Sequence, residues 1–165
     1  MPRYLYLLRH AQSAEKQTGQ TDKERELTTR GIRESIFVGQ EMIREKTLPD
    51  LIICSSSTRT QTTASLVSET LNMDQDAIIS YDELYEASTR ELLQAVAQFE
   101  NSYYRVLCVA HNPAISYLAE YLTKEEIGEI VPAGMVIIEF DNESWAEAAE
   151  GKGKLVRYVK PDGIR

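Results

Sequence analysis

Residues 4–11 read Tyr-Leu-Tyr-Leu-Leu-Arg-His-Ala, an apolar run that gives way abruptly to an arginine and a histidine. Three further short apolar runs follow, at residues 51–54, 106–110 and 135–140. Near-continuous apolar character over about four to six residues is typical of strands buried on both faces, as in the interior of a parallel sheet. The four runs therefore predict the centre of a largely parallel sheet.

Segments with helical spacing lie between these runs. Each predicted helix has an apolar face, and the four faces consist of Ile32, Ile36 and Ile43; Ala64, Val67 and Leu71; Leu92, Val96 and Phe99; and Ile115, Leu118, Ala119 and Leu122. Strands that alternate with helices predict right-handed crossovers. The fold class is therefore α/β, a three-layer α/β/α sandwich with a mostly parallel central sheet. The alternating stretch 155–159 predicts an edge strand.

Length and charge narrow the class of protein. A chain of 165 residues that is 42% hydrophobic suits one compact domain over residues 1–165. Its net charge of −8 opposes binding to nucleic acid or to an anionic membrane. The N-terminus enters the first predicted strand without a signal segment, and the two cysteines, Cys54 and Cys108, lie within apolar runs as expected of free buried thiols. These features predict a cytoplasmic protein.

The only two histidines, His10 and His111, both follow a predicted strand directly. Ligands of open α/β sheets bind at the carboxyl ends of the strands. One histidine in such a place is more often a surface or core residue, but two together favour a functional site.

Basic and helix-starting residues accompany these histidines. Arg9 precedes His10, and its planar guanidinium can grip two phosphate oxygens. Asn112-Pro113 predicts an N-cap followed by proline at the first helical position, which would present N–H groups to an anion. Arg59 follows a run of hydroxyl residues, 55–58, at another predicted helix start. The alternative for this last segment is a serine cap with Arg59 as a surface charge.

Two arginines and two histidines at one sheet edge describe a pocket for a phosphate dianion. The sequence has no phosphate-binding P-loop, no dinucleotide fingerprint and no evident metal cluster. A side-chain nucleophile remains, and neutral imidazole is a competent one near pH 7. The polar stretches 15–26 and 141–154 are predicted to be solvated loops. The first of them follows His10 closely enough to border the site.

Six segments in order resemble the histidine phosphatase superfamily, which is named for its Arg-His-Gly motif, and in particular its SixA-type phosphohistidine phosphatases. They are Leu8-Arg9-His10-Ala11, Leu27 to Gly31, Ser55 to Arg59 with Ala64, Leu84 to Ser88, Ala110 to Pro113, and Pro132-Ala133-Gly134. The chain departs from the superfamily pattern at Ala11, which is usually glycine, and at Ser56, which is usually proline.

The resemblance implies a phosphoglycerate-mutase-like fold and a role for each matching residue. His10 would attack phosphorus, and Arg9, Arg59 and His111 would bind the phosphoryl oxygens. Glu86 would protonate the leaving group, with Asp82 and Glu83 as neighbouring candidates. Neither a metal nor another cofactor is expected.

The short connections between motifs leave little chain for a cap over the site. An uncapped site favours phosphohistidine in a protein as substrate. The alternatives are a small-molecule phosphomonoesterase and a non-catalytic phosphate-binding module. The intact His10 disfavours the module.

Overall fold

A single sheet forms the middle of the computed structural model, which describes residues 1–162. Its strand order is β3-β2-β4-β1-β5-β6. The strands are β1 (Arg3–Arg9), β2 (Leu51–Ser55), β3 (Ile78–Tyr81), β4 (Arg105–Ala110), β5 (Met135–Phe140) and β6 (Gly153–Val159). The four strands from β3 to β1 are mutually parallel, whereas β5 and β6 are antiparallel to their neighbours.

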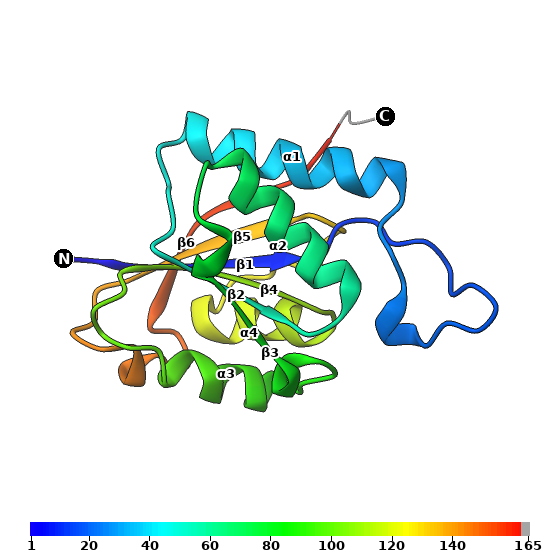
Figure 1. The fold of residues 1–165 in the computed structure, drawn as a ribbon. Helices are drawn as coiled ribbons and strands as arrows, with labels where there is room; N and C mark the ends of the chain where they lie inside the picture. The colour runs from blue at the N-terminus through cyan, green and yellow to red at the C-terminus, as the bar shows by residue number, and fades with distance from the viewer. Residues whose placement is uncertain (163–165) are drawn as a thin grey trace.

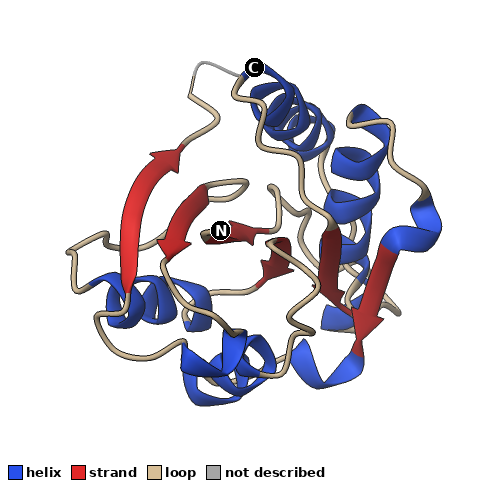
Figure 2. Ribbon diagram, turned by 90° about the vertical axis from the view of Figure 1, so that its left-hand side faces the viewer, coloured by secondary structure: helices blue, strands red, loops and turns tan. Residues whose placement is uncertain are grey.

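Four α-helices in residues 1–162 cover the two faces of this sheet: α1 (Thr29–Arg44), α2 (Thr58–Thr70), α3 (Thr89–Ala97) and α4 (Ala114–Thr123). Figure 1 shows α1 and α2 on one side of the sheet, with α3 and α4 on the other. Figure 2, turned to look roughly along the strands, shows the twisted sheet between these two layers. The predicted α/β/α sandwich is thus confirmed.

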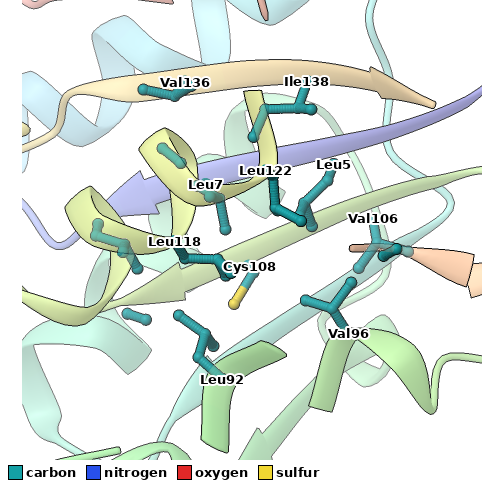
Figure 3. Packing of buried hydrophobic residues seen from close by; sticks show 14 of the residues in the cluster. Leu5, Leu7, Leu92, Val96, Val106, Cys108, Leu118, Leu122, Val136 and Ile138 are labelled. Carbon is teal, nitrogen blue, oxygen red and sulfur yellow. The ribbon is translucent and has the colours of Figure 1, made fainter. Parts of the chain in front are cut away.

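The core consists of two clusters separated by the sheet. On β1, Tyr6 and Leu8 contribute to the cluster under α1 and α2, whereas Leu5 and Leu7 contribute to the cluster over α3 and α4. This alternation follows from the two-residue period of a strand, and it explains why a strand buried on both faces is apolar throughout. Figure 3 shows the second cluster, where Leu92 and Leu118 point toward Leu7 and Cys108 of the sheet.

Short 3₁₀ helices and polar caps join these elements. The 3₁₀ helices are η1 (Asp22–Glu24), η2 (Gln75–Ala77), η3 (Asp82–Leu84) and η4 (Trp145–Glu147). Thr28, Ser57 and Ser88 cap α1, α2 and α3, because the oxygen of each side chain accepts a backbone N–H from the first turn. No helix within residues 1–162 is both long and apolar enough to cross a membrane.

The predicted apolar face of the first helix is wrong. Ile32 and Ile43 are 41% and 49% exposed, whereas the buried side of α1 carries Gly31, Val38 and Met42. Small residues, rather than isoleucines, allow this helix to approach its neighbours closely. A Cβ on Gly31 would stand 2.2 Å from the backbone oxygen of Gln12.

The sheet also differs from the prediction in two strands. The run 135–140 is antiparallel to β1, because the loop before it returns the chain to the carboxyl end of β1, where Met135 pairs with Leu8. The edge strand β3 was not predicted, because it has only four residues and residues 79–81 are exposed. The predicted edge strand at 155–159 is confirmed as part of β6. Cys54 and Cys108 are buried free thiols, and burial raises their pKa to about 11 and about 12.

Candidate active site

The carboxyl ends of β1 and β4 place the two histidines side by side. These strands pair in parallel with Arg9 opposite Ala110, so the next residue of each chain segment is a histidine. The ring centroids of His10 and His111 are 5.4 Å apart. Sheet register alone therefore brings together residues that are 101 positions apart in the sequence (111 − 10).

The His10 imidazole is held in one tautomer. Its Nδ1 lies 2.8 Å from the carbonyl oxygen of Ala11. Because a carbonyl can only accept, Nδ1 carries the proton and Nε2 keeps its lone pair. Burial lowers the pKa of His10 to about 3, and the nearby cationic groups act in the same direction, although the Ala11 hydrogen bond opposes them. The ring is thus neutral near pH 7, with Nε2 available as a nucleophile.

His111 is oriented by a group of buried hydroxyls. Its Nε2 lies 2.6 Å from Oγ of Ser55, and that oxygen is 2.7 Å from Oγ1 of Thr60. Burial, followed by the charge of Arg59, lowers the pKa of His111 to about 4. The Ser55 contact occupies Nε2 and leaves Nδ1 as the ring nitrogen that can serve a ligand.

The two arginines reach the same place from β1 and α2. Arg9 donates from Nη1 to the Ile130 carbonyl at 2.9 Å and lies 3.5 Å from the Glu129 carboxylate. Its buried Nε has no hydrogen-bond partner among residues 1–162. Arg59 comes from the first turn of α2, and its side chain is only 8% exposed. Ser57 caps this helix as the alternative expected, but the burial of Arg59 shows that the surface charge of that alternative is wrong.

Asp22 is a member of the site that no sequence motif indicated. Arg59 donates to its backbone oxygen at 2.8 Å and to Oδ2 at 3.0 Å, and the Tyr85 hydroxyl donates to Oδ2 at 2.6 Å. Arg25 adds a hydrogen bond to Oδ1 at 3.1 Å. Tyr85 first, and then Arg25 and Arg59, hold the pKa of the Asp22 carboxyl below its ordinary value, although partial burial opposes them. The one sequence signal was the position of the 15–26 stretch after His10.

Only one of the three candidate proton donors, Glu86, lines the cavity between the two histidines and the two arginines. Glu86 is exposed at its rim beside Tyr85, in a left-handed backbone conformation with φ of 59°. Asp82 instead forms an ion pair with Lys23 and accepts from Ser56, each at 2.5 Å. Glu83 faces a separate cavity beside α3.

The predicted N-cap at Asn112 is wrong. Helix α4 begins at Ala114 after Pro113, which provides no side-chain cap. The Asn112 amide instead donates to the Ile130 carbonyl at 2.8 Å and accepts from Ser116 Oγ at 2.5 Å. Its side chain is therefore used to join the loop at residue 130 to α4, which leaves the first turn of the helix without that cap.

A cavity of about 240 Å³ joins these groups. It is lined by all five residues that the sequence marked as site residues, Arg9, His10, Arg59, Glu86 and His111, and by Ser13, Arg25, Tyr85 and Asn112. A neutral imidazole beside two guanidinium groups can bind a small dianion and attack it. No group of three or more His, Cys, Asp or Glu side chains within residues 1–162 is arranged to hold a metal ion.

An α/β protein with this pocket belongs to the class of phosphate-handling enzymes that bind their substrate at the carboxyl ends of parallel strands. Residues 5–93 match the model of the histidine phosphatase superfamily, branch 1, and the chain therefore belongs to that superfamily. Membership of this superfamily supports a phosphatase function. The matched segment contains Arg9, His10, Arg59 and Glu86 but ends before His111. The comparison with curated protein sequences found no match.

Solved structures support the fold over nearly the whole chain. A protein assigned as the phosphohistidine phosphatase SixA of Agrobacterium tumefaciens has a TM-score of 0.83 and 24% identity, over 98% of this chain and 99% of that one. The protein histidine phosphatase SixA in complex with tungstate has a TM-score of 0.81 and 20% identity, over 96% and 97% of the two chains. A mycobacterial glucosyl-3-phosphoglycerate phosphatase has a TM-score of 0.68 and 17% identity, over 94% and 98%. The predicted phosphoglycerate-mutase-like fold is confirmed.

Proposed function

We propose that the protein hydrolyses phosphohistidine in a protein substrate through a covalent phosphoryl intermediate on His10. The observation that carries this proposal is the hydrogen bond from Nδ1 of His10 to the Ala11 carbonyl, which directs the lone pair to Nε2. A pKa lowered to about 3 keeps that nitrogen unprotonated at neutral pH. A binding module would have no use for such a nucleophile.

The reaction has two displacement steps. In the first, the Nε2 lone pair forms a bond to phosphorus, and the P–N bond to the substrate imidazole breaks with its electron pair leaving on that imidazole. In the second, water attacks the phosphorylated His10 and releases inorganic phosphate, and His10 regains its lone pair. Arg9, Arg59 and the Nδ1–H of His111 hold the phosphoryl oxygens. Positioning and charge stabilisation of this kind provide most of the catalysis in phosphoryl transfer.

Glu86 is our candidate for the acid that protonates the leaving group, since it alone of the three nearby carboxylates lines the cavity. Its exposed position at the rim suits contact with the part of the substrate beyond phosphorus. An imidazole leaving group needs this proton less than an alkoxide does. A small-molecule phosphomonoesterase activity is therefore the alternative in which Glu86 would matter most.

We further propose that the protein acts without a metal, as a single domain with no large cap, and in the cytoplasm. The positive charge of the pocket comes from arginine side chains, which fits catalysis without a metal. An open site at the sheet edge is accessible to a histidine on the surface of another protein. The buried free thiols fit a reducing compartment.

The covalent step is tested by acid-free quenching of turnover with ³²P-labelled phosphohistidine. Label should be trapped on His10 as a phosphoryl group that is stable to base and labile to acid. His10→Ala should abolish both the label and turnover, because the other imidazole of the pocket, His111, has its Nε2 engaged by Ser55 and directs Nδ1–H to the ligand. Label on a serine, or label that persists in His10→Ala, would contradict the mechanism. Turnover of phosphoserine or sugar phosphates in preference to phosphohistidine would favour the small-molecule alternative.

A further inference from the structure

A second cavity of about 520 Å³ adjoins the candidate active site. The two cavities share Arg9 and Asn112, so a substrate bound in the first lies at the entrance of the second. The remaining lining residues come from the start of α4 and from the loop that follows this helix: Pro113, Ser116, Tyr117, Glu120, Gly128 and Glu129. We call this cavity the α4 groove. It is about twice as large as the phosphate pocket, which is itself large enough for a phosphoryl group.

Tyr117 is the aromatic residue of the α4 groove. Tyr117 is 61% exposed, and no hydrogen bond to its hydroxyl occurs among residues 1–162. Tyr121, one helical turn further on, is 39% exposed on the same side of the helix. Exposed tyrosines that do nothing for the fold are typical anchors of protein–protein contacts, because they offer a large apolar ring at little cost in side-chain entropy.

The charge of the α4 groove favours a cationic partner. Glu120 accepts the backbone N–H groups of Ile127 and Gly128 through Oε2, and these bonds lower the pKa of its carboxyl. Glu129 is 77% exposed, with Arg9 as its ion-pair partner at 3.5 Å. When a phosphoryl dianion binds to Arg9, the charge of that arginine is compensated by the dianion. Two carboxylates then face whatever chain carries the phosphoryl group.

We propose that the α4 groove binds the polypeptide that flanks the phosphohistidine and prefers a basic residue in that flanking segment. This inference rests on the proposed function and specifies its substrate. A free phosphorylated amino acid would fill the phosphate pocket and leave the groove empty. A polypeptide would place its backbone against Tyr117 and a lysine or arginine near Glu129. The groove therefore affects the KM of a polypeptide substrate and leaves the turnover of free phosphohistidine unchanged.

Three phosphorylated probes test the proposal: free phosphohistidine, a phosphohistidine peptide with lysines on both sides, and the same peptide with glutamates in their place. Tyr117→Ala should raise KM for the lysine peptide by about fivefold or more, as expected for loss of an interfacial tyrosine. It should not change kcat/KM for free phosphohistidine. Tyr117→Ser repeats the measurement with a second truncation. Tyr81→Ala is the matched control, because Tyr81 is 41% exposed but lines the cavity beside α3.

Charge reversal provides an independent readout. Glu129→Lys should reverse the preference between the two peptides, so that the glutamate peptide becomes the better substrate. Any general disturbance of Arg9 would lower all three activities together and cannot produce this reversal. The proposal is overturned if both Tyr117 variants match wild type on the lysine peptide, or if Glu129→Lys leaves the preference unchanged. If wild type hydrolyses both peptides with equal kcat/KM, the groove proposal alone fails, whereas hydrolysis of free phosphohistidine but of neither peptide contradicts both the groove and the protein substrate of the proposed function. If it hydrolyses none of the three probes, the proposed function fails as well.

Discussion

At the scale of single residues, the backbone around His10 is fixed from several directions. Its own N–H donates to the Ala110 carbonyl at 3.2 Å, and its carbonyl accepts from the Ala133 N–H at 3.2 Å. The N–H of Ala11 donates to Thr63 Oγ1 at 3.0 Å, and this hydroxyl donates to the Arg59 carbonyl at 2.7 Å. One threonine therefore couples the candidate nucleophile to the turn that carries Arg59. Such a backbone can hold Nε2 in place before a substrate arrives.

Asp22 acts on catalysis through Arg59 and Tyr85, and we class it as a positioning residue. Asp22→Asn removes one charge-assisted bond to Arg59 but retains the bond to the backbone carbonyl of residue 22. Such a bond contributes about 1.5–3 kcal/mol. We therefore expect kcat/KM to fall at least about tenfold on every substrate, measured by phosphate release. A rise in kcat/KM would mean instead that Asp22 competes with the phosphoryl group for Arg59.

Glu86→Gln is the matched carboxylate-to-amide control for Asp22→Asn. Glu86 lines the cavity, and Asp22 contacts Arg59 and Tyr85 of its lining, but Glu86 has no part in holding Arg59. If Glu86 is the proton donor, this change should lower phosphoester turnover by about 10²–10⁴-fold, as is typical for loss of a general acid. Turnover of phosphohistidine should fall much less. The two variants thus differ in whether the loss depends on the leaving group.

At the scale of secondary structure, the start of α1 supports the nucleophile loop by close contact. The Thr28 N–H donates to the Gln12 carbonyl at 3.0 Å, and the Gln12 N–H donates to Glu34 Oε1 at 2.9 Å. Gly31 faces the same carbonyl so closely that a side chain has no room there. The helix therefore abuts the chain two residues after His10, and any shift of α1 is transmitted to the site.

Gly31→Ala should damage stability and activity together. Its Cβ would meet backbone, which cannot move aside as a flexible side chain can. Overpacking typically costs about 1–3 kcal/mol, reduced here by the roughly 1 kcal/mol that alanine gains over glycine in a helix. Displacement of the His10 loop should also lower kcat/KM, by up to about 10²-fold for a shift near 1 Å. Urea unfolding and phosphohistidine turnover measure the two effects.

Gly39→Ala separates these effects. A Cβ on Gly39 would stand 2.6 Å from Cβ of Thr70, where α1 packs on the end of α2. The position is two helical turns from Gly31, so a clash there should lower stability by a similar amount without a loss of kcat/KM in the folded protein. Equal losses of activity in both variants would show that α1 affects the site only through global stability.

At the scale of the whole molecule, the sequence predicted the location of the site residues better than it predicted the packing of the helices on the sheet. His10 and His111 could be placed at one edge because each directly follows a continuous apolar strand. Arg59 could be placed there because a helix start follows β2. These are local sequence patterns. Residues that follow parallel strands lie at the same edge of the sheet, so such patterns are sufficient to predict that the side chains lie together.

Features that depend on long-range contacts could not be predicted in this way. The buried face of α1 is determined by a close approach to Gln12 and Thr70, so its most apolar positions, Ile32 and Ile43, remain exposed. Asn112 bonds to the distant Ile130 carbonyl instead of capping α4. Asp22 reaches Arg59 across a polar stretch that has no periodicity. In each case the contacting residue lies far away in the sequence, and no local sequence pattern predicts the contact.

Two buried neutral histidines also make the whole fold sensitive to acid. In the unfolded chain, histidine has a pKa near 6.5. In the folded protein, burial lowers the pKa of His10 to about 3 and that of His111 to about 4. Between pH 6.5 and about pH 4 the unfolded chain therefore binds more protons than the folded one. The free energy of unfolding must then rise with pH in this window and fall as the pH is lowered.

His10→Gln isolates the share of His10 in this effect. Glutamine does not titrate, and its amide N–H can still donate toward the Ala11 carbonyl. Between pH 7 and pH 5, protonation of His10 in the unfolded chain should cost wild type about 2 kcal/mol of unfolding free energy, at about 1.36 kcal/mol per unit below the unfolded pKa. The variant should lose about that much less over the same interval, measured by urea unfolding at both pH values. Carboxylates titrate equally in both proteins, so they cancel in the difference. Parallel pH profiles for wild type and His10→Gln would mean that His10 is protonated as readily in the folded protein as in the unfolded chain, which contradicts a buried neutral nucleophile.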